Sequence, residues 1–303
     1  QRLWDSPEQF TTLSKKLREK LDQEFEFSHL QTEKIIRASD RRTQKILFRL
    51  PDGLALETVL MHYPLKTSHD RHTVCISTQV GCAMGCTFCA TGQMGFQRNL
   101  SSGEIVEQVV NSARQLAESG HSLTNVVVMG MGEPFHNYDA TLEAIRRLNH
   151  PEGMKMGARR FTISTVGLVP RIRQLAQEDI QVNLAISLHA ADDELRSSML
   201  PINDKYPIRE VLNACREYAK ITSRRVTFEW ALVKDVNDTA EQARKLALLL
   251  RGMLAHVNVI PLNPTNQFDG EASSANQAKA FQEILEENGI PCNIRLRRVL
   301  GNC

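Results

Sequence analysis

The segment "CAMGCTFC" places Cys82, Cys86 and Cys89 within eight consecutive positions. Thiolates are soft ligands that suit zinc and iron–sulfur clusters. A structural zinc site needs a fourth cysteine or histidine at similar spacing, but nearby His72 lies ten residues before Cys82 and no second C-x-x-C follows. Three thiolates can instead hold three irons of a four-iron cluster and leave the fourth iron open. The spacing therefore favours a three-ligand iron–sulfur cluster over structural zinc and over ordinary buried thiols.

The composition of the whole chain agrees with metal or redox chemistry. The 303 residues carry a net charge of +2 and are 42% hydrophobic, which is enough for one large or two smaller domains. Seven cysteines without an export signal favour metal binding over a disulfide framework. No apolar run approaches the length of a membrane span and no secretory signal is found, so we expect a cytoplasmic protein that does not contact a membrane.

Three kinds of element must position these thiols. Residues 1–45 carry amphipathic helical patterning with a helix start at Ser6 and Pro7, and because the chain begins with Gln1 we expect this module to be incomplete. Two alternating segments around a Pro-Asp-Gly turn predict a β-hairpin, assigned to residues 46–73. From residue 74 to 290 short apolar strands alternate with helical segments, which predicts an α/β parallel sheet or barrel.

Polar residues follow the predicted strands of this array. Ligands of parallel βα arrays gather at the carboxyl ends of the strands, because the loops converge there. The candidates at these ends are Gly130, Gly132 and Glu133, then Ser164 and Thr165, then Ser187 and His189, and finally Asn263. Each residue alone has an ordinary explanation as a turn, a cap or a hydrogen-bonded core group. Their shared position predicts a ligand site at this edge.

Several longer segments carry a family resemblance. The cysteine motif, with Phe88 before its last cysteine, and the segments "DGLALETV", "GFQRNL", "GMGEP", "TISTVGLVP", "SLHA", "LPINDKYPI" and "VNDT" resemble the RlmN-type radical S-adenosylmethionine RNA methyltransferases. The resemblance runs from about residue 5 to about residue 298. It implies a partial (β/α)6 barrel with a small N-terminal helical accessory domain, one 4Fe-4S cluster, and two molecules of S-adenosylmethionine per turnover.

The resemblance also implies roles for the residues at the strand ends. In this family the methionine part of the cofactor chelates the open iron, and an electron from the cluster cleaves a carbon–sulfur bond to give a 5′-deoxyadenosyl radical. Matching by motif, Gly132 and Glu133 would bind the amino side of that methionine, and Ser164 the ribose or carboxylate region. Ser187 and His189 would surround the ribose and adenine, and Asn263 would lie on the adenine side.

The implied reaction converts adenosine to 2-methyladenosine in 23S ribosomal RNA and in some transfer RNAs. By resemblance Glu57 is the proton acceptor, Cys75 the resolving thiol, and Cys303 the thiol that becomes S-methylcysteine and then forms a transient disulfide with Cys75. Without the motif, Glu57 would read as a solvated strand carboxylate and Cys75 as a core thiol. The tail "NIRLRRVLGNC", in residues 291–303, lacks the flanks of the family's carrier segment. Cys215 and Cys292 match no family function and are expected in the core.

Basic residues are the candidate RNA contacts, because phosphate neutralisation dominates affinity for nucleic acids. They are Lys34, Arg37, Arg41, Arg42, Lys45 and Arg49 near the N-terminus, and Arg295, Arg297 and Arg298 in the tail. A solvated face is the alternative explanation of these runs. We further expect a monomer that receives electrons from a donor such as a flavodoxin system.

Three alternative functions remain open from the sequence. The nearest is a Cfr-type enzyme that methylates adenine at carbon 8. The second is a radical enzyme acting on a small molecule or peptide, and the third is a non-enzymatic iron–sulfur electron carrier. The polar strand ends disfavour the electron carrier, and "GMGEP" and "GFQRNL" favour the RlmN type over the Cfr type.

Overall fold

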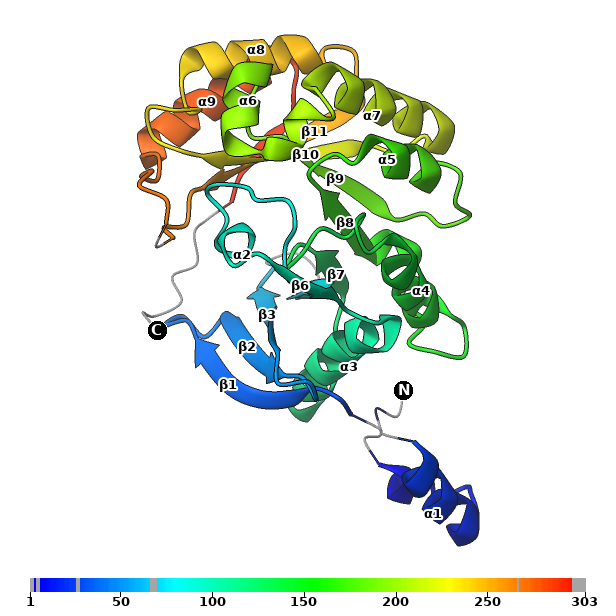
Figure 1. Ribbon diagram of the computed structural model, residues 1–303. Helices are drawn as coiled ribbons and strands as arrows, with labels where there is room; N and C mark the ends of the chain where they lie inside the picture. The colour runs from blue at the N-terminus through cyan, green and yellow to red at the C-terminus, as the bar shows by residue number, and fades with distance from the viewer. Residues whose placement is uncertain (1–2, 4–5, 26–27, 66–69, 266, 296–303) are drawn as a thin grey trace.

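The computed structural model describes residues 3, 6–25, 28–65, 70–265 and 267–295 (Figure 1). The strands are β1 (Gln31–Arg37), β2 (Thr43–Arg49), β3 (Ala55–Tyr63), β4 (Arg71–Cys75), β5 (Gln79–Gly81), β6 (Phe96–Asn99), β7 (Asn125–Val128), β8 (Phe161–Thr165), β9 (Asn183–Ser187), β10 (Val226–Leu232), β11 (Ala255–Pro261) and β12 (Cys292–Ile294). The α-helices are α1 (Lys15–Glu24), α2 (Ala90–Gln93), α3 (Ser102–Glu118), α4 (Tyr138–Asn149), α5 (Val169–Leu175), α6 (Asp193–Met199), α7 (Ile208–Thr222), α8 (Ala240–Leu250) and α9 (Ala275–Glu287). Short 3₁₀ helices are η1 (Pro7–Gln9), η2 (Ala158–Arg160) and η3 (Pro201–Asp204).

One sheet organises the described part of the chain. Its strand order is β1-β2-β3-β4-β7-β8-β9-β10-β11-β12, and every pair from β4 to β12 is parallel. At least one α-helix lies between each pair of successive strands in this parallel part of the sheet, so the expected βα array is confirmed. The sheet is open, with β1 and β12 at its edges, as expected of a partial barrel.

Helices α3 to α5 and α7 to α9 cover the outer, convex face of the curved sheet, as Figure 1 shows. Side chains on that face are apolar and buried, including Val126, Phe161, Ile186, Phe228 and Val257. The alternate residues of the same strands point to the concave face, because successive side chains of a strand alternate in direction. The concave face is therefore the one available to a ligand. No helix in the described ranges is both long and apolar enough to cross a membrane.

The N-terminal region differs from the expected helical module in two respects. Gln31–Arg37 is a strand rather than a helix, because it pairs with β2 in antiparallel register despite its polar composition. The main N-terminal helix starts at Lys15, where the Ser14 side chain accepts a hydrogen bond from Leu17 N. Ser6 and Pro7 instead precede only the 3₁₀ helix. The predicted hairpin is thus part of a three-stranded antiparallel extension.

The hairpin turn itself was predicted correctly. The Leu50 and Leu54 backbones pair across it, and Gly53 adopts a φ of +81°, which a residue with a side chain rarely takes. The turn is also tied to the barrel, because Arg98 donates to Asp52 at 2.6 Å and makes a two-point contact with the Glu104 carboxylate at the start of α3. The hairpin tip and the first barrel helix are therefore held together.

Candidate active site

The three-cysteine loop lies between β5 and β6, at the carboxyl edge of the parallel strands. Its base is closed by a bond from Cys82 N to Gly95 O at 2.9 Å. A Cβ on Gly81 would lie 1.8 Å from the Gly95 carbonyl oxygen, so only glycine allows this approach. On the far side of the loop, Thr87 N bonds to Met199 O at 3.0 Å, and Cys86 is buried in a small apolar cluster. The backbone thus fixes the thiols before any metal binds.

The spacing of the thiols fits a cluster better than a single ion. Tetrahedral zinc would bring sulfur atoms to about 3.8 Å from one another, given Zn–S bonds of about 2.3 Å. Among the described residues, the three thiols are not a group whose ligand atoms lie within 4.8 Å of one another. Burial raises the pKa of Cys82 to about 11 and that of Cys86 to about 12. Cys82 and Cys86 are therefore protonated at neutral pH until a metal displaces the protons.

The Gly-Met-Gly-Glu loop after β7 packs directly on the chain that leads to the cysteines. A Cβ on Gly130 would lie 2.7 Å from Ile76 O, and one on Gly132 would lie 2.5 Å from the Gln79 side chain. Gly132 also has a φ of +99°. Both glycines are thus required for close approach. This requirement explains the motif without a ligand and also places its backbone beside the cysteine loop.

Glu133 is buried and forms a link between two strand ends. Its carboxylate accepts backbone hydrogen bonds from Phe135 N and Val166 N, both at 2.9 Å. Burial raises the pKa of Glu133 to about 7. Each carboxylate oxygen can accept more than one bond, so the predicted contact with an ammonium group is compatible with these bonds.

Ser164 and Ser187 meet on the concave face, as the shared strand-end position predicts. Their hydroxyl oxygens lie 3.4 Å apart, and both residues are half-buried. Adjacent hydroxyl groups can both donate and accept, which suits recognition of a ribose or a carboxylate.

His189 also lies beside the cysteine loop, with its ring edge-on to Phe88 at 4.9 Å between centroids. Its Nδ1 accepts a bond from Ala231 N at 2.9 Å, so the proton of the neutral ring is on Nε2. Burial and the charge of Arg196 lower the pKa of His189 to about 3. The ring is therefore a neutral hydrogen-bond donor at physiological pH.

Asn263 shows the weakest agreement with the prediction. It follows β11 and is exposed. Its loop does approach the cysteine region, because Gln93 of α2 donates to Thr265 at 2.9 Å. The predicted adenine contact remains a prediction.

Two supporting residues were missed by sequence reasoning. Arg196 is fully buried and donates to Leu188 O, Val166 O, Tyr206 O and the Asn203 side chain. Asn237, in the "VNDT" segment, donates to His189 O at 2.8 Å and to Ala231 O at 2.7 Å. Both hold loops rather than face solvent. Arg196 stands among polar residues in "DDELRSSM" and gives no sequence signal for such a role, whereas Asn237 lies in the "VNDT" segment that carries the family resemblance.

Glu57 lies at the carboxyl edge of the parallel strands because β3 runs antiparallel to them. Val59 is directly opposite Cys75, and Glu57 is two residues earlier, so Glu57 and Cys75 lie on one face. The Ser77 hydroxyl donates to Glu57 O at 2.6 Å, and Lys45 contacts the carboxylate at 3.1 Å. Burial raises the pKa of Cys75 to about 12.

The remaining three cysteines fall into two groups. Cys215 and Cys292 are buried in the main core, as expected. Cys303 lies outside the described residues, as do Arg297 and Arg298.

Two of the basic residues near the N-terminus that are candidate RNA contacts form ion pairs within the protein. Arg49 pairs with Glu33 at 2.6 Å and Lys45 with Glu57 at 3.1 Å. Lys34, Arg37 and Arg41 are exposed on β1 and in the turn that follows it.

Comparison with known proteins identifies the family of this chain. Residues 76–247 match the Radical SAM superfamily. The chain is 51% identical to the dual-specificity RNA methyltransferase RlmN 1 of Myxococcus xanthus, over 86% of this chain and 71% of that protein. It is 48% identical to the probable dual-specificity RNA methyltransferase RlmN of Chloroflexus aurantiacus, over 96% and 79% of the two chains. The crystal structure of a radical SAM methyltransferase from Sphaerobacter thermophilus has 51% identity and a TM-score of 0.93, over 97% of this chain and 84% of that one.

The superfamily match begins one residue after Cys75 and includes all three clustered thiols. The family implies a 4Fe-4S cluster and S-adenosylmethionine, and three thiols on one loop are the soft ligands that such a cluster takes. This chain belongs to the RlmN family of radical S-adenosylmethionine RNA methyltransferases.

Proposed function

We propose that this protein methylates carbon 2 of adenosine in 23S ribosomal RNA and in transfer RNA. One observation carries the proposal: Glu57 and Cys75 share the face of the β3–β4 ladder that ends at the three-thiol loop. A carboxylate and a second thiol beside a cluster loop are the groups that ring methylation through a cysteine adduct requires.

Cys82, Cys86 and Cys89 would hold one 4Fe-4S cluster, which supplies the electron that cleaves S-adenosylmethionine to a 5′-deoxyadenosyl radical. Two molecules of S-adenosylmethionine are consumed, one for each of the methylation and radical steps. Glu133, Ser164 and the Nε2–H of His189 orient the cofactor from three strand ends. Asn263 extends this contact set on the adenine side. A flavodoxin-type donor provides electrons, and the protein acts as a monomer.

In the proposed sequence Cys303 would carry the methyl group as S-methylcysteine, give one hydrogen atom of that methyl group to the 5′-deoxyadenosyl radical, and become bonded through the resulting carbon radical to carbon 2 of the adenine ring. Glu57 would take the proton from ring carbon 2, and the one electron that remains on the adduct would pass to the oxidised cluster. The Cys75 sulfur then bonds to the Cys303 sulfur, the carbon–sulfur bond to the base breaks, and the base carbon keeps the electron pair and gains a proton. Because burial keeps Cys75 protonated, its deprotonation must be coupled to this step.

The domain assignment is part of the same proposal. Residues 1–45 form an accessory RNA-binding region with Lys34, Arg37, Arg41 and Arg42, and residues 46–73 form the β extension that carries Glu57. Residues 74–290 form the partial barrel, and residues 291–303 carry Cys303 together with the basic residues Arg295, Arg297 and Arg298. The target adenosine must leave its stack to reach the concave face.

The test is mass spectrometry of 23S ribosomal RNA and transfer RNA after anaerobic reaction with the cluster-loaded protein. We expect 2-methyladenosine, and finding only 8-methyladenosine would assign the protein to Cfr-type chemistry. Cys75→Ala should accumulate a covalent protein–RNA adduct, while the matched core variant Cys215→Ala should turn over normally. Absence of both methylated nucleosides with an intact cluster would refute the proposal.

A further inference from the structure

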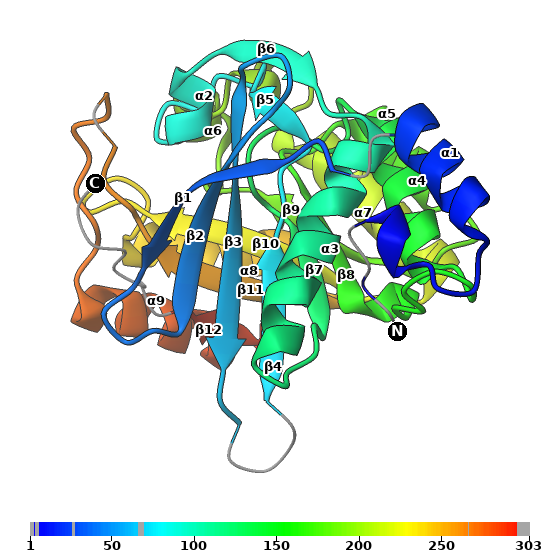
Figure 2. The ribbon, with the colours of Figure 1, turned by 90° about the horizontal axis from the view of Figure 1, so that it is seen from below.

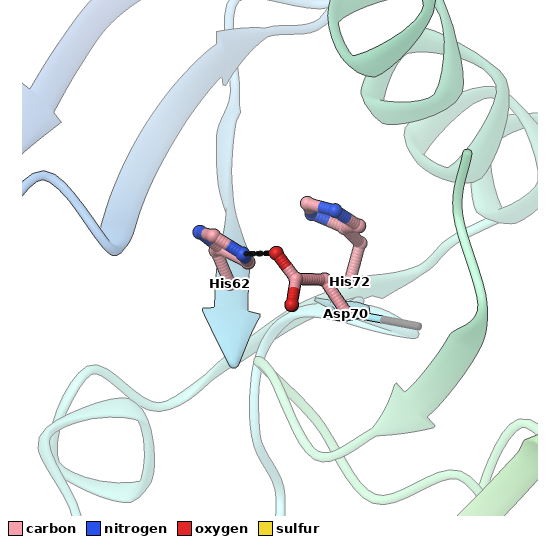
Figure 3. Close-up of side chains that lie close together, drawn as sticks. All are labelled: His62, Asp70 and His72. Carbon is pink, nitrogen blue, oxygen red and sulfur yellow. Dashed lines mark hydrogen bonds and ion pairs between the residues drawn. The ribbon is translucent and has the colours of Figure 1, made fainter. Parts of the chain in front are cut away.

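Three potential metal ligands gather at the opposite end of β4 from Cys75. His62 on β3 and His72 on β4 are direct partners in the antiparallel ladder, and Asp70 lies two residues before His72. Figure 3 shows the His62 and Asp70 side chains joined by a hydrogen bond of 2.7 Å, with the His72 ring beside them. One ligand atom from each residue lies within 4.8 Å of the others. In the described part of the chain, no other group of histidine, cysteine or carboxylate side chains meets this condition.

The backbone of this group is held in place. His72 N donates to the Thr124 hydroxyl at 3.0 Å, and Thr124 N donates to His72 O at 2.9 Å. Cross-strand partners have Cβ atoms roughly 4.5–5.5 Å apart, a separation that two side chains can bridge through one ion. The three candidate ligands are therefore presented by a fixed ladder rather than by a loose loop.

His72 carries an unsatisfied group. It is only 4% exposed, and its Nδ1 is buried without a hydrogen-bond partner. An unpaired buried polar atom is costly, and buried imidazole nitrogens normally bind a donor, an acceptor or a metal.

A third imidazole lies against the group. The His121 ring, in the turn after α3, lies 4.7 Å from the His72 ring, and the His62 and His72 rings are stacked at 4.6 Å with 10° between their planes. The nitrogen lone pairs of stacked rings lie in parallel planes and cannot meet at one ion, so metal coordination requires the rings to rotate about χ2. Without a metal, the three ligands therefore lie close together but not in a coordinating geometry.

We propose that His62, Asp70 and His72 form a binding site for a divalent transition metal such as zinc, separate from the iron–sulfur site. Two imidazoles and one carboxylate are a ligand set that zinc commonly accepts, with His121 or water in the fourth position. The Asp70 carboxylate can either coordinate directly or orient the His62 ring as an outer ligand.

The site would stabilise structure rather than take part in methylation. Figure 2 shows the end of β3 and the start of β4 at the end of the molecule remote from α2, β5 and β6, which flank the thiol loop. A bound ion would join the end of β3 to the start of β4 and, through His121, to the end of α3. Methylation is expected to proceed without it.

The experiment uses the cluster-loaded protein, so that the three thiols are already occupied. The protein is incubated anaerobically with two equivalents of zinc chloride, desalted, and analysed for zinc and iron. We expect one zinc per chain beyond the four irons, and at least about tenfold weaker zinc binding in His72→Gln and in Asp70→Asn. The control His150→Gln, which changes an exposed histidine in the turn after α4, should retain the zinc.

The spectrum of bound cobalt(II) distinguishes this site from free thiols. Cobalt(II) in the proposed site should give weak ligand-field bands without sulfur-to-cobalt charge transfer. An unchanged iron content and methylation rate in His72→Gln would show that this variant is folded. The proposal is overturned if the parent protein retains no zinc, if His72→Gln retains as much as the parent, or if bound cobalt shows thiolate charge transfer.

Discussion

The two edges of the parallel sheet hold their polar groups in different ways. At the carboxyl edge, the buried side chains of Glu133, Arg196 and Asn237 are bonded to backbone amides and carbonyls of the loops. His72 at the amino edge, and Glu229 and His256 in a cavity of about 880 Å³ lined mainly by β8 to β12 and the loops that precede them, each bury a polar atom without a hydrogen-bond partner in the described part of the chain. The Thr78 hydroxyl, between β4 and β5, is an exception at the carboxyl edge. The carboxyl edge thus uses Glu133, Arg196 and Asn237 to hold the loops that follow its strands, whereas His72 at the amino edge has no such partner.

The largest expected effect would confirm the carboxyl edge as the reactive one. Cys86→Ala should remove the iron–sulfur absorbance and lower RNA methylation below detection, because two thiolates cannot hold a cubane that requires three. Iron analysis and a methylation assay check this outcome. Cys215→Ala, which alters a thiol buried in the core, should retain both iron and activity, and equal losses in the two variants would remove the distinction.

A large stability effect is expected from Arg196→Met. The substitution leaves the carbonyl oxygens of Leu188 and Val166 buried without donors, so we expect a loss of about 3–5 kcal/mol in the free energy of unfolding. Urea denaturation of the parent protein and of Arg196→Met measures this loss. The matched change Arg173→Met breaks an exposed pair with Glu217 and should cost about 0–1 kcal/mol. Similar losses would show that the carboxyl-edge loops do not depend on this side chain.

A moderate, pH-dependent effect is expected from His189→Asn. Because the pKa of His189 is lowered in the folded protein, the unfolded chain binds more protons, and stability falls as the pH drops below about 6.5. Between pH 6.5 and pH 5 this group should remove about 1–2 kcal/mol. Asparagine tolerates the φ of +61° and can accept the Ala231 N–H bond, so the variant should be less sensitive to acid. An unchanged pH profile would argue against a neutral buried ring.

The smallest effect is expected at the amino edge. Without added metal, His62→Gln should change the free energy of unfolding by less than about 1 kcal/mol, because the pair with Asp70 is partly exposed. Its methylation rate should equal that of the parent. Thermal denaturation of the parent and of His62→Gln, with and without zinc, measures how much zinc stabilises each protein. A large loss of methylation activity in the metal-free variant would show that the two edges are coupled.

The sequence predicted the elements whose patterns are local. The alternating βα segments, the Pro-Asp-Gly turn and the cysteine spacing all appear in the structure as expected. Strand β1 was missed because its polar residues follow no period of two and its pairing with β2 decides its conformation. Ser164 and Ser187 could be grouped from their strand-end positions.

The supports of the site could not be predicted in the same way. The bonds of Arg196 connect loops that follow different strands, and no local pattern encodes such contacts. The roles of Glu57 and Cys75 came from resemblance, since either residue alone looks like an ordinary strand residue. The ladder then showed that they share a face, which spacing of 18 residues could not have indicated.

The antiparallel direction of β3 has a consequence for how this enzyme can diversify. A strand such as β3, which runs antiparallel to the barrel strands, can change the side chain that it presents at one point by sliding along its neighbour. A shift by two positions would place Ala55 or Val59 where Glu57 lies, and a shift by one position would turn the Glu57 carboxylate to the other face. The bond between Asp52 and Arg98 resists such sliding. Lengthening or shortening the turn before β3 is thus a route by which related chains, or protein engineers, could move the proposed proton acceptor without altering the barrel.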